Sequence, residues 1–349
     1  SSDVCSSDLL SQATNGGLIV GHINPVTGAS VTTGSPFRGI QFVGPNATPQ
    51  PFSFGIVQGP VCGNCSAEVE NAAFDNLTVA FKSTTLFGLA TYDVTDKIKA
   101  SIQLNYGRAI STNNSVPNTA FGSLRIASDN AYLPASIKTQ MQAAGISTLL
   151  VGSTYLNNIP SNPTDWSWDN LEQGIGMPIG HLTRRLLRTV VSLDGDMDDG
   201  WYGQKWNWKA YYQGGRTHMY QTSWNNNITA NLTAAIDAVV AQPGNAAGAP
   251  VGSIICRSTL TNPTNGCVPL NIFGVNTASP AAIRYVNVKP GDNFQDQHFN
   301  QDVFSLALSG QLPFGFNAGN AALAFGGEHR RERGLTVVDR SEEHTSELQ

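Results

Sequence analysis

"KIKASIQLNYG", residues Lys97–Gly107, alternates between apolar and polar side chains. Successive side chains of an extended strand point to opposite faces, so this period of two predicts a β-strand with one apolar face. The apolar row is Ile98, Ala100, Ile102, Leu104 and Tyr106, and the polar row is Lys97, Lys99, Ser101, Gln103 and Asn105. The fold class depends on what the apolar row contacts: another sheet, a helix or lipid.

The same alternation recurs in pairs, each pair around a short turn. The quoted stretch follows the turn "YDVTDK" and an apolar row of Leu77, Val79, Phe81, Phe87 and Leu89. A second pair has Leu187, Thr189, Val191 and Leu193, the turn "DGDMDDG", and Trp206, Trp208, Ala210 and Tyr212. A third has Phe304, Leu306, Leu308 and Leu312, the turn "PFGFNAG", and Ala321, Leu323 and Phe325. We therefore predict an all-β fold with about six antiparallel strands in three hairpins.

Long segments rich in Asn, Ser, Pro and Gly separate these hairpins, whereas most connections in compact domains have about two to six residues. Short turns at one end of the strands and long loops at the other are typical of outer-membrane barrels, whose apolar face points outward. The opposite row, with Glu328, Arg330 and Glu332, suits a wide wet lumen. The smallest such barrels have about eight strands, so six strands predict an arc, a partial transmembrane β-barrel with long extracellular loops.

The amino-acid composition indicates a surface with fewer charges than that of a typical soluble domain. Charged residues make up 13% of the chain, against roughly 25% in typical soluble domains, and 40% of the residues are hydrophobic. No apolar run approaches the roughly 18 residues of a membrane helix.

Both termini differ from the rest of the chain. "SSDVCSSDL" (residues 1–9) and "RSEEHTSELQ" (residues 340–349) can be encoded by one DNA read from opposite strands, and that DNA resembles a sequencing adapter. We interpret both as adapter-derived artefacts around a partial barrel of residues 10–339, truncated at both ends. Excluding them brings the formal net charge from −5 close to neutrality, without the basic footprint of a nucleic-acid-binding protein.

Four cysteines remain, Cys62, Cys65, Cys256 and Cys267, all in predicted loops. Their even number and two short spacings favour disulfides in an oxidising compartment. A Cys256–Cys267 bond would close a short loop and stabilise the fold by about 3 kcal/mol. Whether Cys62 pairs with Cys65 stays open, since "CGNC" also has the redox C-x-x-C spacing.

The sequence contains no motif of a known catalytic or metal site. Asp194, Asp196 and Asp198 have the spacing that begins a calcium loop, but Asp199 stands where Gly is needed and Lys205 where a bidentate Glu is needed. "GIGMPIG" (residues 174–180) misses the dinucleotide-binding spacing. The histidines at positions 22, 181, 218, 298 and 329 are far apart in sequence. We predict no catalytic residue, no metal site, no cofactor and no enzyme activity.

Aromatic and helical patterns mark two further regions. Six aromatic residues gather around the second hairpin, either as an aromatic girdle with barrel packing or as a ligand-stacking surface: Trp201, Tyr202, Trp206, Trp208, Tyr211 and Tyr212. Leu232, Ile236 and Val239 have the spacing of a short helix in the third long loop.

Several stretches together resemble TonB-dependent receptors of the bacterial outer membrane. "GCVPLNIFG" (residues 266–274), preceded by Cys256, resembles their disulfide loop, and "ALAFGGEHRRE" (residues 322–332) resembles one of their strands. "NAYLPASIKTQMQAAGI" (residues 130–146) and "NLTAAIDAVVA" (residues 231–241) resemble helical pieces of their extracellular loops. The TonB box, the plug domain and the closing strands of the family are not in this sequence, which implies a fragment that does not transport alone.

The resemblance implies energy-coupled uptake of a scarce nutrient, such as an iron-siderophore, a cobalamin or a glycan. The expected partners are membrane lipid, TonB through the missing N-terminal region, and a small-molecule or glycan ligand bound by residues that the sequence does not identify. The alternatives are a surface adhesin or secreted β-rich binding protein, and a passive porin.

Overall fold

The computed structural model describes residues 9–59, 61–66, 78–115, 118–154, 178–200, 204–316 and 319–339. The predicted artefacts therefore lie outside the described residues except for Leu9. The chain divides into two compact units. Unit 1 comprises Ser1–Thr78, Asn113–Gly180 and Ser223–Asp292, and unit 2 comprises Val79–Thr112, His181–Thr222 and Asn293–Gln349.

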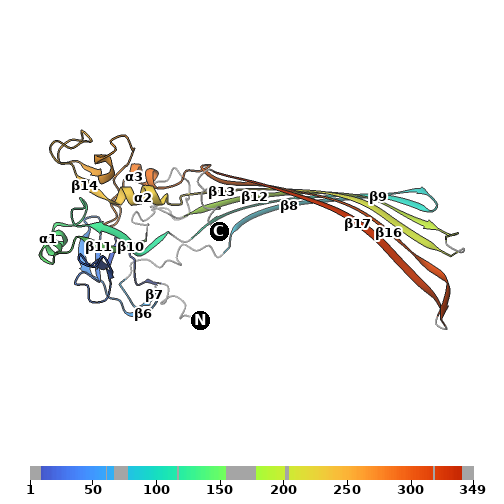
Figure 1. Cartoon of the computed structure of the whole chain (residues 1–349), viewed down its shortest axis with the longest axis horizontal. Coiled ribbons are helices and arrows are strands. Elements are labelled where there is room, and N and C mark those ends of the chain that lie inside the picture. Colours follow the sequence, from blue (N-terminus) through green and yellow to red (C-terminus); the bar gives the residue numbers. More distant parts are fainter. Residues whose placement is uncertain are drawn as a thin grey trace. The chain divides into compact units, whose positions relative to one another are not determined.

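Unit 2 is a sheet of long strands that run side by side in Figure 1. Among the described residues it has six strands in the order β17-β16-β13-β12-β9-β8. They are β8 (Ala80–Thr95), β9 (Ile98–Asn114), β12 (Ile179–Met197), β13 (Trp206–Trp224), β16 (Asn293–Phe316) and β17 (Gly319–Val338). Sequence neighbours pair, so the prediction of an all-β fold with three hairpins is confirmed. The third turn is shorter than predicted, because β16 continues through Pro313 to Phe316.

The strand register separates an apolar from a polar face on β9. Directly paired residues of antiparallel strands share a face. Leu104 pairs with Gly88 and Ile102 with Ala90. The intervening residues Gln103 and Asn105 pair with Leu89 and Phe87.

The apolar row predicted on β8 therefore does not continue the row on β9. Phe87 and Leu89 share the face of Asn105 and Gln103 instead, while Leu86, paired with Tyr106, lies on the apolar face. Alternation within one strand does not reveal which of its faces matches the next strand, because a register step of one residue exchanges the faces. The first hairpin consequently exposes large apolar side chains on both sides.

Unit 1 is built from the segments that the sequence predicted to be long loops. Its main sheet has the order β10-β11-β2-β4-β5, with β3 on β2. The strands are β2 (Leu18–Ile23), β3 (Ser30–Val31), β4 (Ile40–Val43), β5 (Thr48–Pro51), β10 (Thr119–Ala127) and β11 (Thr148–Thr154). The short strands β1 (Leu9–Leu10), β6 (Ile56–Gln58) and β7 (Val61–Gly63) form a second sheet.

In the described part of unit 1, three α-helices accompany these strands: α1 (Ala135–Ala143), α2 (Thr229–Ile236) and α3 (Pro280–Val286). Gly145, at φ +64°, follows α1, in the left-handed conformation that commonly ends helices. Ser279 caps α3 by accepting a hydrogen bond from the backbone N–H of Ala282. The two helical stretches named from the family resemblance thus contain α1 and α2, and α3 is additional.

The prediction that Val239 belongs to the helix of the "NLTAAIDAVVA" stretch was wrong. Helix α2 ends at Ile236, and Val239 lies in strand β14 (Ala238–Val240), where it pairs with Ile255 of β15 (Ile254–Cys256). The strand pairing overrides the local helical spacing, since helix propensity is a weak preference that tertiary contacts routinely overcome.

The core of unit 1 joins all three of its segments. Ile19, Met141 and Ile283 come from different segments, and all are buried in one cluster. Phe42 and Phe273 meet edge to face in the same cluster, with ring centroids 4.8 Å apart. The predicted loops are therefore one folded body with its own hydrophobic core.

Candidate functional site: a sheet with two different faces

Side-chain contacts continue the polar face across unit 2. The hydroxyls of Ser101 on β9 and Ser192 on β12 are 2.6 Å apart. Lys209 on β13 forms an ion pair with Asp194 on β12 at 3.3 Å. Side chains that touch project from the same side of a sheet, so the alternate residues of each strand lie on the opposite face.

That opposite face is apolar and largely exposed over its middle. The exposed fractions are 49% for Ile102, 45% for Val191, 49% for Leu306 and 57% for Phe325. Soluble monomers rarely expose contiguous apolar patches larger than a few hundred Å². This face is named the apolar face below.

The polar face carries a continuous hydrogen-bonded chain across four strands. The Arg188 guanidinium donates to Gln213 Oε1 at 2.9 and 2.6 Å, and Gln213 Nε2 donates to Gln301 Oε1 at 2.8 Å. Gln301 Nε2 then donates to Glu332 Oε1 at 2.7 Å. These four residues border a cavity of about 500 Å³. The cavity offers a cation, a carboxylate and amides, which suit a polar ligand with several hydroxyl or carbonyl groups.

Charged pairs occupy the turn end of the sheet. Lys97 Nζ lies 2.9 Å from Asp198 Oδ2, and the hydrogen bond between them, followed by their charges, raises the pKa of Lys97 and lowers that of Asp198. Asp194 pairs with Lys209, and Asp196 accepts a hydrogen bond from Asn207. The acidic turn that has the spacing of a calcium loop thus has its carboxylates engaged by side chains of the sheet.

The aromatic residues of the second hairpin divide between the two faces. Trp206 is buried, packs edge-on against Phe325 at 6.4 Å and covers Gly310, where an added Cβ would lie 2.2 Å from the indole. Tyr211 instead donates to Glu328 on the polar face. Trp206 therefore packs within the sheet, while Trp201 and Tyr202 lie outside the described residues.

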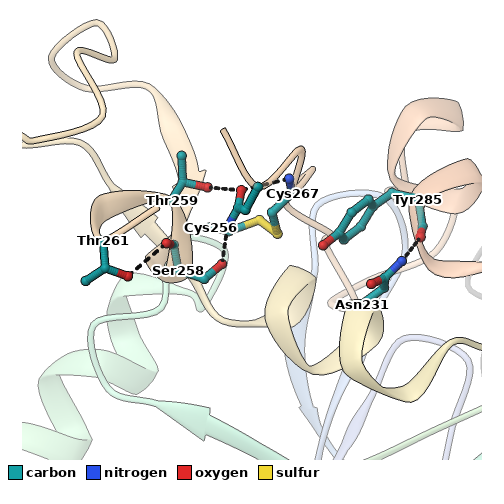
Figure 2. Close-up of a disulfide and its surroundings, with 8 residues drawn as sticks. Asn231, Cys256, Ser258, Thr259, Thr261, Cys267 and Tyr285 are labelled. Atoms are coloured by element: carbon teal, nitrogen blue, oxygen red, sulfur yellow. Dashed lines mark hydrogen bonds between the residues drawn. A yellow bond between two sulfur atoms is a disulfide. The ribbon is translucent and has the colours of Figure 1, made fainter. Parts of the chain in front are cut away.

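All four cysteines of the described chain are paired, Cys62 with Cys65 and Cys256 with Cys267. The sequence left the pairing of Cys62 with Cys65 open, and in the structure these two cysteines form a disulfide. Figure 2 shows the second disulfide closing its loop beside η4 (Arg257–Leu260). Inside that loop, Asn265 accepts from the Cys267 N–H and the Thr259 hydroxyl and donates to Ser258. Nearby, Asn231 of α2 donates to the Tyr285 carbonyl of α3.

An ionic cluster joins two segments of unit 1 next to this loop. Arg257 donates to Asp129 at 3.0 and 2.6 Å and to Asp237 at 3.1 and 3.0 Å. The hydrogen bonds from Arg257 hold the pKa of Asp129 below its ordinary value, against a smaller opposing effect of burial. Asp237 follows α2 directly, so the cluster also fixes the point where the helix gives way to β14.

One cluster was missed by the sequence interpretation. His218 of β13 and His298 of β16 stack with ring centroids 4.4 Å apart, and both reach Asp296. His218 and Asp296 are separated by 78 positions, and only the pairing of two strands far apart in sequence brings them together. A weak local signal existed in Asp296-Gln297-His298, since residues two apart on a strand share a face.

"GIGMPIG" lies mostly outside the described residues, and its last residues begin β12. Over the described ranges, no helix combines the length and apolarity required to cross a bilayer. A scan against protein-family models found no match, and a search of curated proteins found no significant relative.

Proposed function

We propose that the sheet of unit 2 is an arc of a TonB-dependent receptor barrel in a bacterial outer membrane. In this proposal the parent protein imports a scarce, bulky nutrient by energy coupling through TonB. The stretch that resembles a family strand forms part of β17, and the stretch that resembles the family disulfide loop contains Cys267, which is bonded to Cys256. Closing a barrel would require further strands beyond the six described here.

The exposed apolar face is the observation that carries the proposal. Its side chains, among them Ile102, Leu306 and Phe325, are exposed to about half their area, although the opposite face of the second and third hairpins is hydrogen-bonded and charged. A sandwich or a soluble barrel would cover this face with a second layer. Hydrocarbon chains are a medium in which large apolar side chains on one face and a wet interior on the other are both favourable.

The polar face would then line the lumen, and its cavity beside Arg188 and Glu332 is the candidate ligand site. Its mixed donors and acceptors could serve an iron-siderophore, a cobalamin or a glycan. Unit 1, with its own core, would supply the extracellular part that first meets the ligand.

A second candidate is a surface adhesin or secreted binding protein. The independent core of unit 1 and its disulfides favour it, because such a module binds partners without a barrel. In that case the apolar face of unit 2 would contact protein rather than lipid.

Nitroxide spin labels distinguish the two. We expect labels replacing Ile102 and Leu308 in the vesicle-reconstituted parent protein to be quenched by oxygen, which concentrates in hydrocarbon. Labels at the matched polar-face positions Gln103 and Ser309 should instead be quenched by a water-soluble nickel chelate. Preferential nickel quenching at Ile102 and Leu308 would refute lipid contact and favour the binding module.

A further inference from the structure

His218, Asp296 and His298 form a compact cluster on two neighbouring strands. Asp296 and His298 lie two residues apart on β16 and so share a face, and His218 reaches them from β13. The Nε2 atom of His218 is 2.7 Å from Asp296 Oδ1, and that of His298 is 3.2 Å from the same oxygen. One ligand atom from each side chain lies within 4.8 Å of the other two.

We propose that these three side chains bind a divalent transition-metal ion such as Zn²⁺. Imidazole nitrogen and carboxylate oxygen bind Zn²⁺ at about 2.0–2.2 Å, so neighbouring ligand atoms around a tetrahedral ion lie about 3.3 Å apart. The 3.2 Å separation of His298 and Asp296 already has this value. The shorter contact of His218 is a hydrogen bond, which the ion would replace: Nε2 would bind the metal while the other ring nitrogen, Nδ1, carries the proton.

The rings must move slightly to share an ion. Their planes are inclined by only 12°, whereas each nitrogen lone pair lies in its ring plane and has to point at the metal. Binding would require rotation about χ2 to direct both lone pairs at one ion, and the energy well of this torsion is broad. The three side chains project from the same face as Leu306, but they lie near the ends of β13 and β16 that are away from the hairpin turns, outside the exposed apolar middle. They are 36%, 31% and 46% exposed, so an ion can enter from solvent there and keep an open position for water.

The surroundings favour occupancy by a cation. Arg216, the nearby guanidinium on β13, forms its ion pair with Asp302 at 3.1 Å rather than with Asp296. Apolar side chains flank the cluster, since His298 pairs with Leu335 and Asp296 with Val337. Tyr220 and Phe294 stack beside it, with ring centroids 6.2 Å apart. Two imidazoles and a carboxylate with apolar neighbours are a donor set typical of zinc, copper, iron or nickel.

The ion would cross-link the second hairpin to the third, because His218 belongs to one and Asp296 and His298 to the other. This role needs only the pairing of β13 with β16. It therefore goes beyond the proposed receptor function and would hold equally in an adhesin.

Zn²⁺ titration of the full chain, followed by calorimetry, tests the site. We expect one strong Zn²⁺ site that His218→Ala and Asp296→Asn each weaken by more than about 10-fold, the smallest typical effect of losing even an outer-shell partner. The control is His329→Ala: His329 lies on β17, pairs with Phe304 of β16 outside the cluster, and its loss should leave the affinity unchanged. Asp296→Asn keeps the size of the side chain, and circular dichroism verifies that each variant retains the β-sheet.

Electron paramagnetic resonance of bound Cu²⁺ gives a second readout. Two nitrogen ligands are expected in the original chain and one in His218→Ala. A chain that takes up no Zn²⁺, or variants that bind as tightly as the original, would overturn the proposal and leave the cluster as a hydrogen-bonded pair of imidazoles on a carboxylate.

Discussion

At the scale of single residues, Arg257 shows how two distant segments of unit 1 are held together. Its guanidinium has five donors in a planar fork, which lets it bind Asp129 and Asp237 at once. Lysine has a single compact ammonium group and would keep at most part of this geometry. The cluster is partly exposed, with 40% of the Arg257 side chain accessible, so its energetic contribution is modest.

We predict that Arg257→Ala lowers the free energy of unfolding of unit 1 by about 1 kcal/mol at neutral pH, the upper range for exposed ion pairs. Guanidinium or urea denaturation followed by circular dichroism measures this change. Arg257→Lys should lose less, and Arg284→Ala, at an exposed position of α3, is the control.

The same pair makes a pH-dependent contribution. Because the pKa of Asp129 is lowered in the folded chain, its stabilisation is complete above the ordinary value of 3.8 and is lost as the pH falls through the lower folded pKa. We expect this part of the acid sensitivity to disappear in Arg257→Ala. An equal acid-induced loss in both proteins, measured between pH 5 and about pH 2, would contradict the assignment to this pair.

At the scale of the element, successive side chains of β16 alternate between the apolar face and the polar face of the sheet. Leu306 pairs with Gly327 on the apolar face, and the preceding Ser305 pairs with Glu328 on the polar face. The two positions are adjacent in sequence, so they differ mainly in the face on which the side chain lies. This makes them a matched pair for testing the medium on each side.

We predict that Leu306→Arg prevents or slows membrane assembly, because an arginine facing hydrocarbon at mid-membrane costs about 2–4 kcal/mol. Ser305→Arg should assemble normally, since the new cation faces Glu328. Folding into lipid vesicles, followed by protease protection, provides the measurement. Equal assembly of the two variants would argue against a lipid-facing apolar side.

At the scale of the whole molecule, the chain passes repeatedly between two folding units. Three separate segments build the core of unit 1, and the intervening hairpins build unit 2. A core residue of unit 1 is therefore expected to stabilise all three segments together. Phe273, 1% exposed and in contact with Phe42, is such a residue.

We predict that Phe273→Ala destabilises unit 1 by about 3–5 kcal/mol, the typical cost of truncating a buried Phe. Hydrogen exchange should then lose protection in β2, α1 and α3 together, while the β16–β17 ladder keeps its protection. Val251→Ala, at a position with 66% exposure, should change neither unit. Loss of protection confined to the segment around Phe273 would show that the three segments do not share one core.

Local pattern was enough to locate all three hairpins of unit 2, because the period of two is carried by neighbouring residues such as Ile102, Gln103 and Leu104. It was also enough to identify cysteines close enough in sequence to pair. The "NLTAAIDAVVA" stretch shows where local pattern ends: Val239 has helical spacing but lies in β14, because pairing with Ile255 outweighs propensity.

Contacts between distant segments settled the rest. Register made Phe87 a neighbour of Asn105 rather than a continuation of the apolar row, and the pairing of β13 with β16 assembled His218 with His298. Likewise, the hydrophobic core of unit 1 is formed by residues from segments far apart in sequence, such as Ile19, Met141 and Ile283. Local pattern had predicted these segments to be loops. Periodicity records which side chains share one face of one strand, whereas the partner of that face depends on the free energy of long-range pairing and burial, which no short stretch contains.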